Sequence, residues 1–118
     1  MRIPAIVPPT LSFLASEGVK FLDMQTLVIY DVHDDAQREG LREHLREYGL
    51  RRIQYSGFLG ELNTHDRLIL VKEVGRFLEA KNDSVYVVPL CDRCMKTVKV
   101  IASSGEVKME KSEVDIVP

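Results

Sequence analysis

The chain has 118 residues, of which 45% are apolar and 29% charged, a composition typical of a single soluble globular domain. Its net charge of −2 gives no overall basic signature for nucleic-acid binding, so such binding would have to come from local clusters of Lys and Arg. Two cysteines are too few for a disulfide framework, and a cytoplasmic protein without a membrane partner is therefore expected.

Residues 1–23 are expected to be an extension of the domain. Three prolines interrupt the apolar run there, which is too short to span a bilayer and lacks the cleavage site of a signal peptide. Met24 opens "MQTLVIYD", where the first strong strand pattern begins. We therefore expect the domain to begin at Met24 and the extension to be mobile, and translation to start at either Met1 or Met24.

The stretch "TLVIYDVHDD" predicts a buried strand over 26–32 that contains Asp31 at the end of its apolar run. Asp34 or Asp35 then provides the N-cap of a helix from about Ala36 to Tyr48. The helix carries one apolar stripe, and Gly49 is expected to end it in the left-handed conformation.

The second half of the chain repeats the alternation of strands and a helix. "RRIQYSGFLGEL" (51–62) is rich in strand formers, and its two glycines indicate a bend, bulge or tight hairpin. Thr64 is expected to cap a helix from about His65 to Ala80. Two further strands are predicted at 85–90 and 97–102, and 113–117 is a candidate edge strand in the polar tail, residues 103–118.

This order of elements predicts an α+β fold, a ferredoxin-like βαββαβ sandwich over 24–102 with an extra C-terminal strand. Two helices would cover one face of a four- or five-stranded antiparallel sheet. A doubly wound parallel sheet would need more βα units, and the first turn lacks a glycine-rich phosphate loop. The uncovered sheet face favours pairing with a second chain, so a homodimer is expected.

Asp31 is the candidate metal ligand and catalytic residue. A carboxylate at the end of a strand is a hard oxygen ligand for Mg²⁺ or Mn²⁺, and such an ion activates water and neutralises charge on a phosphodiester. One carboxylate is a weak site, but a two-fold dimer would supply a second Asp31. The structural alternatives are that Asp31 supports the turn into the helix and that the neighbouring His33 is an ordinary loop residue.

Arginines form the candidate nucleic-acid contacts. Arg38, Arg42 and Arg46 recur at helical spacing beside a parallel row of glutamates, and Arg51 and Arg52 follow the helix. Such a strip can contact phosphates without reading bases. A solvent-exposed helix face of alternating charge is the alternative.

Cys91 and Cys94 have the CxxC spacing of half a zinc site or of a redox pair. No histidine in the sequence has a spacing that would complete a four-ligand site. Two reduced thiols in a surface loop are the simpler interpretation.

Four segments occur in a specific order: "LVIYDV" with an acidic helix cap, a helix ending in "YGL", "RRIQYSGFLGEL" and "SVYVVPLC". With them, the chain resembles the CRISPR-associated protein two family, the small partner of the CRISPR adaptation integrase, from about Gln25 to Ile101. It departs from the family pattern at four positions. Ala36 and Gln37 stand where Lys or Arg is frequent in the family. Gly57 stands where a β-branched residue is common, and His33 where a small hydroxyl residue is frequent.

The resemblance implies a homodimer in which Asp31 matches the family aspartate and faces its mate. It implies a CRISPR adaptation (spacer acquisition) subunit that bridges integrase dimers and binds double-stranded DNA, with metal-dependent endonuclease activity on RNA or DNA. The expected nucleic-acid contacts are Arg38, which matches a family position, and Arg42, Arg51 and Arg52. A free-standing, toxin-like ribonuclease and a non-catalytic dimeric interaction module are the alternatives.

Overall fold

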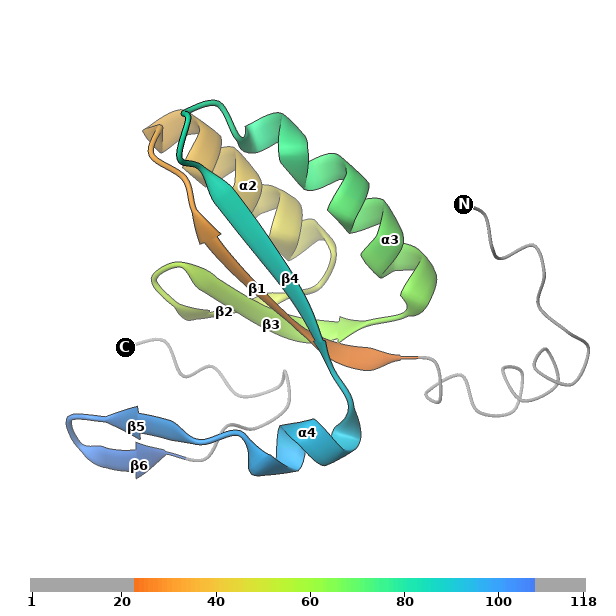
Figure 1. Ribbon diagram of the computed structural model, residues 1–118, viewed down its shortest axis with the longest axis vertical. Coiled ribbons are helices and arrows are strands. Elements are labelled where there is room, and N and C mark those ends of the chain that lie inside the picture. Colours follow the sequence, from red (N-terminus) through yellow and green to blue (C-terminus); the bar gives the residue numbers. More distant parts are fainter. Residues whose placement is uncertain (1–22, 108–118) are drawn as a thin grey trace, which may run out of the picture.

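A four-stranded antiparallel sheet forms the centre of the structure, a computed structural model that describes residues 23–107. Its strands, in the spatial order β2-β3-β1-β4, are β1 (Met24–Asp31), β2 (Arg51–Gln54), β3 (Gly57–Leu62) and β4 (Ser84–Leu90). The connections are helix α2 (Asp35–Glu47), the β2–β3 hairpin, and helix α3 (Thr64–Glu73), which a 3-10 turn (Val74–Phe77) extends. The predicted ferredoxin-like α+β fold is thereby confirmed (Figure 1). Most of the N-terminal extension and the candidate strand at 113–117 lie outside the described residues.

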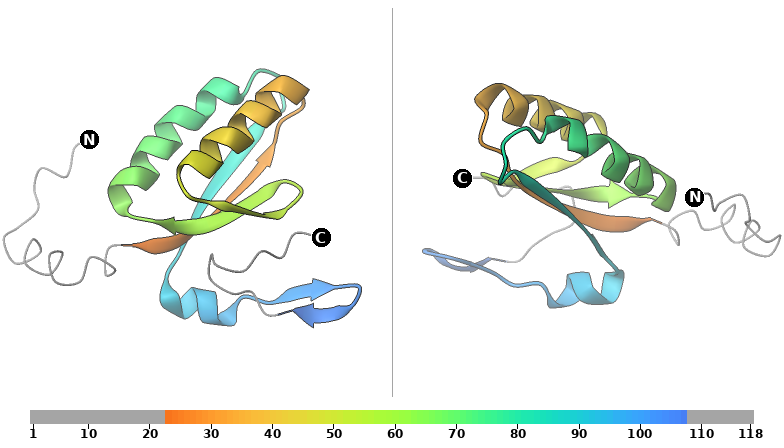
Figure 2. Two further views of the ribbon diagram at one scale, coloured as in Figure 1. Left: turned by 180° about the vertical axis from the view of Figure 1, so that it is seen from behind. Right: turned by 45° about the horizontal axis from the view of Figure 1, so that its top comes forward.

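Helices α2 and α3 cover one face of the sheet (Figure 2). Along β1, alternate side chains point to this face and enter the core, as Val28 and Tyr30 do. The buried residues that pack with them include Leu41, Leu45, Phe58, Leu70, Val74 and Phe77. The apolar stripe predicted for the first helix and the buried side chains of the second therefore form one continuous core.

The helix ends follow the local chemistry of the sequence, with one correction. Asp34 caps α2 as predicted, because its side chain accepts a hydrogen bond from the backbone N–H of Gln37 at 2.9 Å. Gly49 has φ 85°, the left-handed conformation expected after the helix. The prediction of Thr64 as the cap of α3 is wrong, because Asn63 is the cap and its side chain accepts from the N–H of Asp66 at 2.7 Å.

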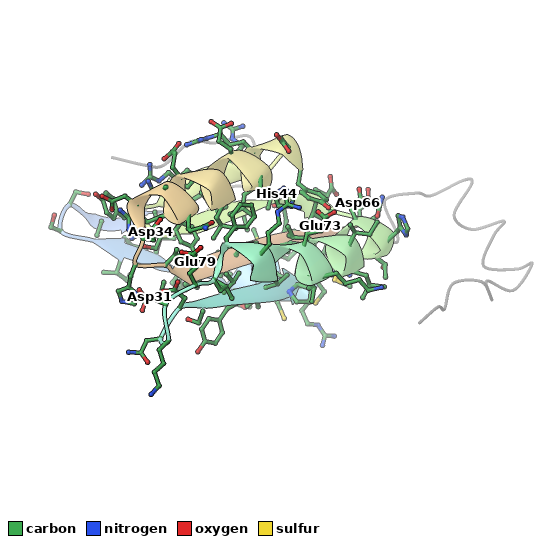
Figure 3. All side chains as sticks on the ribbon, turned by 90° about the horizontal axis from the view of Figure 1, so that it is seen from above. Asp31, Asp34, His44, Asp66, Glu73 and Glu79 are labelled. Atoms are coloured by element: carbon green, nitrogen blue, oxygen red, sulfur yellow. The ribbon has the colours of Figure 1, made fainter. Side chains whose placement is uncertain are left out.

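The two helices are also joined by polar side chains. Glu73 of α3 accepts a hydrogen bond from the Tyr48 hydroxyl at 2.9 Å, and its carboxylate lies 2.9 Å from Nε2 of the buried His44. Burial, with the hydrogen bond to Glu73, raises the pKa of Tyr48 to about 12. Figure 3 shows that His44 and Glu73 lie together between the two helices and away from Asp31, so this group of side chains joins the helices.

The chain after β4 differs from the prediction of a strand at 97–102. Residues Asp92–Thr97 form a short helix, α4, and β5 (Val100–Ala102) pairs with β6 (Gly105–Val107) in a separate two-stranded sheet. Met95 of α4 is buried with Ile53 and Leu59 against the sheet face that α2 and α3 leave open. That face is therefore partly covered by the chain itself, on the side where α4 lies in Figure 2.

Of the helices that the structure describes, none has the length and hydrophobicity needed to cross a membrane.

Candidate functional site

Asp31 is the last residue of β1, and it belongs to the open face of the sheet. Side chains alternate along a strand, so Asp31 shares this face with Leu27 and Ile29, whereas Tyr30 points into the core. Its side chain is 70% exposed. Within one chain this carboxylate therefore remains in water and pays no desolvation cost.

A buried aspartate holds the histidine next to Asp31. The Asp83 carboxylate accepts hydrogen bonds from the backbone N–H of His33 at 3.1 Å and from Nδ1 of its ring at 2.7 Å. Its other oxygen accepts from the backbone N–H groups of Glu79 and Ala80. The imidazole is thereby oriented with Nε2 3.9 Å from a carboxylate oxygen of Asp31.

These contacts move two pKa values in opposite directions. The hydrogen bond from the His33 ring, together with those from the backbone, lowers the pKa of Asp83 to about 2. The hydrogen bond to Asp83 raises the pKa of His33, with a smaller effect from the negative charge of Asp31. Both shifts favour an ionised pair, His33 protonated and Asp83 deprotonated.

The pair should stabilise the fold most between pH 3.8 and 6.5, the ordinary pKa values of the two groups. Below this window, the stability that Asp83 contributes is lost as pH falls through its lowered pKa. Above the window, the stability that His33 contributes is lost as pH rises through its raised pKa.

We expect Asp83→Asn to lower the melting temperature most inside the window and least near pH 2. Melting curves against pH test this. Asp92→Asn, at an exposed carboxylate of α4, should give a small and pH-independent change, and an equal loss for both variants at every pH would contradict the account.

Two arginines of α2 surround the end of β1 without projecting freely into solvent. Arg38 donates to the backbone carbonyls of Val32 and His33 at 2.9 and 3.3 Å, and it also pairs with Asp35. Arg42 donates from Nε to the Tyr30 hydroxyl at 2.9 Å, and its side chain is only 13% exposed. Both side chains thus hold the segment that contains Asp31 in place.

The tip of the β2–β3 hairpin lies beside the same strand end. The backbone N–H of Tyr30 donates to the carbonyl of Ser56 at 3.1 Å, and the Tyr30 hydroxyl donates to the carbonyl of Tyr55 at 3.1 Å. Arg52 donates to the same Tyr55 carbonyl at 2.9 Å. The structure therefore brings Arg38, Arg42 and Arg52 together around the end of β1.

Arg51 is separated from this group by the alternation of β2. It is paired in register with Leu59, which faces α4, whereas Arg52 is paired with Phe58 of the helix-side core. The two adjacent arginines therefore point to opposite faces of the sheet.

Salt bridges separate the predicted arginines into two groups, those with a carboxylate partner and those without one. Arg38 pairs with Asp35, and Arg42 pairs with Glu39. Within residues 23–107, neither Arg51 nor Arg52 has a carboxylate within salt-bridge distance. Their charges are the ones left uncompensated, and they are better placed to attract phosphate.

Cys91 and Cys94 are free, exposed thiols at the start of α4. Hydrogen bonds from the backbone and thiol of Cys94 lower the pKa of Cys91. The register pairs Leu90 with Gln25 and Ser84 with Asp31, so the cysteines lie beyond the opposite end of β1 from Asp31. They therefore cannot complete a site with Asp31 in the same chain.

Sequence reasoning did not select Tyr30, Tyr55 or Asp83 as site residues. Tyr55 lies in the segment 51–62, which is rich in strand formers, and Tyr30 lies in the predicted buried strand, so neither pattern marks a site residue. Asp83 lies 50 residues from its partner His33, and its only local signal is the turn sequence "NDS". The antiparallel pairing of β1 and β4 brings this turn to the end of β1.

Comparison with known proteins gives consistent matches. Residues 24–98 match the family model described as CRISPR associated protein Cas2. A protein of Archaeoglobus fulgidus named CRISPR-associated endoribonuclease Cas2 1 is 42% identical over 94 residues, which cover 80% of this chain and 100% of the relative. A Desulforudis audaxviator protein named CRISPR-associated endoribonuclease Cas2 is 32% identical over 90 residues, covering 76% and 85% of the two chains.

Two solved structures are similar to the fold. A crystal structure described as cas2 has 27% identity and a TM-score of 0.54, covering 79% of this chain and 95% of the other. A hypothetical protein from Thermus thermophilus has 25% identity and a TM-score of 0.56, covering 72% of this chain and 95% of the other.

Proposed function

This chain belongs to the Cas2 family of CRISPR-associated proteins, and we propose that it acts as a homodimeric subunit of CRISPR adaptation. In this role it bridges two integrase dimers and binds the backbone of double-stranded DNA. The same molecule carries a site for metal-dependent phosphodiester hydrolysis at Asp31. The observation that carries the hydrolytic part is an exposed carboxylate at the end of β1, in a segment that Arg38 and Arg42 hold in place from the helix side.

A divalent cation, Mg²⁺ or Mn²⁺, is the cofactor that we propose for Asp31. The residues of one chain fit it only in part: among residues 23–107, no group of three or more His, Cys, Asp or Glu side chains is arranged to hold a metal ion. Asp31 would hold the ion, and its other ligands would be water and Asp31 of the partner subunit. When bound, such a cation neutralises charge developing on the phosphodiester and lowers the pKa of water.

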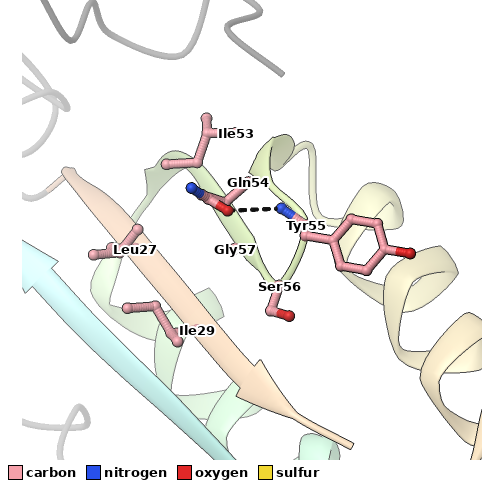
Figure 4. Close-up of a pocket in the computed structure, with 7 residues that line it drawn as sticks. All are labelled: Leu27, Ile29, Ile53, Gln54, Tyr55, Ser56 and Gly57. Atoms are coloured by element: carbon pink, nitrogen blue, oxygen red, sulfur yellow. Dashed lines mark hydrogen bonds between the residues drawn. The ribbon is translucent and has the colours of Figure 1, made fainter. Parts of the chain in front are cut away.

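The dimer proposal is supported by the part of the open sheet face that α4 leaves uncovered. Ile29 and Tyr86 are neighbours across β1 and β4 and are 44% and 63% exposed. Beside them is an apolar hollow of 410 Å³, drawn in Figure 4, which is lined by Leu27, Ile29, Ile53, Gln54, Tyr55, Ser56 and Gly57. A second copy on this face would bury apolar surface and bring the two Asp31 residues near the symmetry axis.

DNA backbone binding is assigned chiefly to Arg51 and Arg52, because carboxylates do not neutralise their charges. Arg38 and Arg42 contribute positive potential, but their hydrogen bonds make them supports of the site more than mobile phosphate ligands. The net charge of −2 predicts that binding depends on these few arginines and weakens steeply with salt.

A free-standing ribonuclease is the second candidate, and the names of the relatives favour it, since both are called endoribonucleases. It would use the same Asp31 site without an integrase.

One pair of assays separates the two functions. We expect the protein to bind the purified integrase, and a strain carrying Asp31→Ala to acquire spacers at the wild-type rate, because bridging does not use the carboxylate. Robust turnover of labelled RNA that depends on Asp31, together with no integrase binding, would instead assign the ribonuclease function.

A further inference from the structure

Tyr55 lies at the tip of the β2–β3 hairpin and is 75% exposed. Two guanidinium groups lie near its ring, that of Arg52 at 5.1 Å and that of Arg42 at 5.8 Å from the ring centre. No other exposed aromatic ring in the described part of the chain has a guanidinium group beside it. Tyr86, the other exposed aromatic residue described, lies instead on the apolar sheet face next to Ile29.

The backbone that carries this ring is held firmly. The Tyr55 carbonyl accepts hydrogen bonds from the Tyr30 hydroxyl and from Arg52, and its N–H donates to the Gln54 side chain at 3.0 Å (Figure 4). None of these bonds uses the Tyr55 ring or its hydroxyl. Figure 4 shows the Tyr55 ring pointing away from the hollow that the proposed dimer would cover, so the ring remains exposed on a backbone that is already ordered, which lowers the entropy cost of binding.

The charges beside the ring favour a polyanion. Arg42 pairs with Glu39, whereas among residues 23–107 Arg52 bonds only to the carbonyl oxygens of Gln54 and Tyr55 and has no carboxylate partner. An aromatic surface next to a free cation is the arrangement with which proteins bind single-stranded nucleic acid, one stacking a base and the other contacting phosphate. A base within a duplex has both faces covered by its neighbours and cannot use the ring in this way.

We propose that Tyr55 stacks on an unpaired nucleobase and that Arg52 contacts the phosphate adjoining it. The proposal deepens the proposed function and rests on its nucleic-acid binding: it gives the end of β1 a site for single-stranded segments in addition to duplex backbone. The Tyr55 ring contributes stacking, and Arg52 contributes the salt-dependent attraction.

The test uses fluorescence anisotropy with labelled oligonucleotides of about ten nucleotides, oligo(dT) and oligo(rU), and with a blunt DNA duplex. We expect Tyr55→Leu to weaken single-strand binding by about tenfold, while Tyr55→Phe stays close to wild type because it keeps the ring. Duplex binding should be unchanged in both variants. If Tyr55→Leu binds oligo(dT), oligo(rU) or both more weakly than wild type, the proposal is supported, and the affected oligonucleotide identifies the sugar that the site accepts.

Salt dependence separates the two residues. Tyr55→Leu should leave the slope of log affinity against log salt unchanged, whereas Arg52→Gln should reduce it by about one contact. Equal affinities of the Leu and Phe variants for single strands, with wild-type duplex binding retained, would overturn the stacking proposal and leave the proposed function standing. Failure of the wild-type protein to bind the duplex would count against the proposed function itself. Melting temperatures of the two Tyr55 variants should match wild type, since the ring is exposed.

Discussion

Replacing Asp31 by Asn should reduce metal-dependent phosphodiester cleavage by at least about 100-fold. The amide keeps the size of the side chain but removes the negative charge that would hold the cation. The fold should be unaffected, because the carboxylate is largely exposed and its only ion-pair neighbour within residues 23–107 is His33, at 3.9 Å. Cleavage of labelled RNA and DNA with Mg²⁺ or Mn²⁺, with and without a chelator, measures the effect.

Asp66→Asn is the matched control for this variant. Asp66 is a carboxylate at the start of α3, and Figure 3 shows it far from Asp31, at the other end of the helix layer. The Asp66→Asn variant should cleave RNA and DNA at the wild-type rate. If cleavage persists in Asp31→Asn, or if it is insensitive to a chelator, Asp31 is not the metal-binding residue of the hydrolytic site.

Placing a charge on the open sheet face should dissociate the dimer that we propose. We expect Ile29→Asp to raise the dimer dissociation constant by about 100-fold or more, because a carboxylate buried in an apolar interface without a partner is costly. Ile29 also lies two residues before Asp31 on the same strand face, so the change would add repulsion near the symmetry axis. Sedimentation velocity over a range of concentrations measures the dissociation.

Leu68→Asp provides the comparison for Ile29→Asp. Leu68 is exposed to a similar extent but lies on α3, on the side of the molecule away from the open face. Its substitution should leave the oligomeric state unchanged. If Ile29→Asp were as dimeric as wild type, the interface would have to lie elsewhere.

Most of the fold could be predicted because its signals are local. The apolar stripe and caps of α2 and the strand pattern of β1 require no knowledge of distant residues. Gly60 is also explained by close backbone contacts: a Cβ there would lie 2.9 Å from the Cα of Leu50 and 3.2 Å from the carbonyl oxygen of Gly49, so the close packing of β3 against the segment after α2 requires glycine.

The segment after β4 was harder to predict because its pattern is ambiguous. The residues 97–102 alternate as a strand would, but Thr97 ends α4, where its hydroxyl donates to the carbonyl of Cys94. Met95 makes the helix favourable by filling the space over Ile53 and Leu59. That gain is a tertiary contact, and no short stretch of sequence reveals it.

The site shows the same division between local and distant signals. The position of Asp31 after an apolar run indicated its strand end, and helical spacing indicated a row of arginines. Spacing alone does not show which arginines pair with carboxylates. It also does not show that Arg51 and Arg52 point in opposite directions, because their directions depend on strand register. The support of His33 by Asp83 depends on the pairing of β1 with β4 and has no local signature.

The most direct test of the account counts Mn²⁺ bound per chain, by electron paramagnetic resonance of the free ion during a titration of the full-length protein. If two Asp31 carboxylates share one cation at a symmetry axis, the titration should saturate at about one Mn²⁺ for every two chains and be lost in Asp31→Asn. Saturation at one ion per chain in a monomeric protein, or unchanged binding in Asp31→Asn, would contradict it.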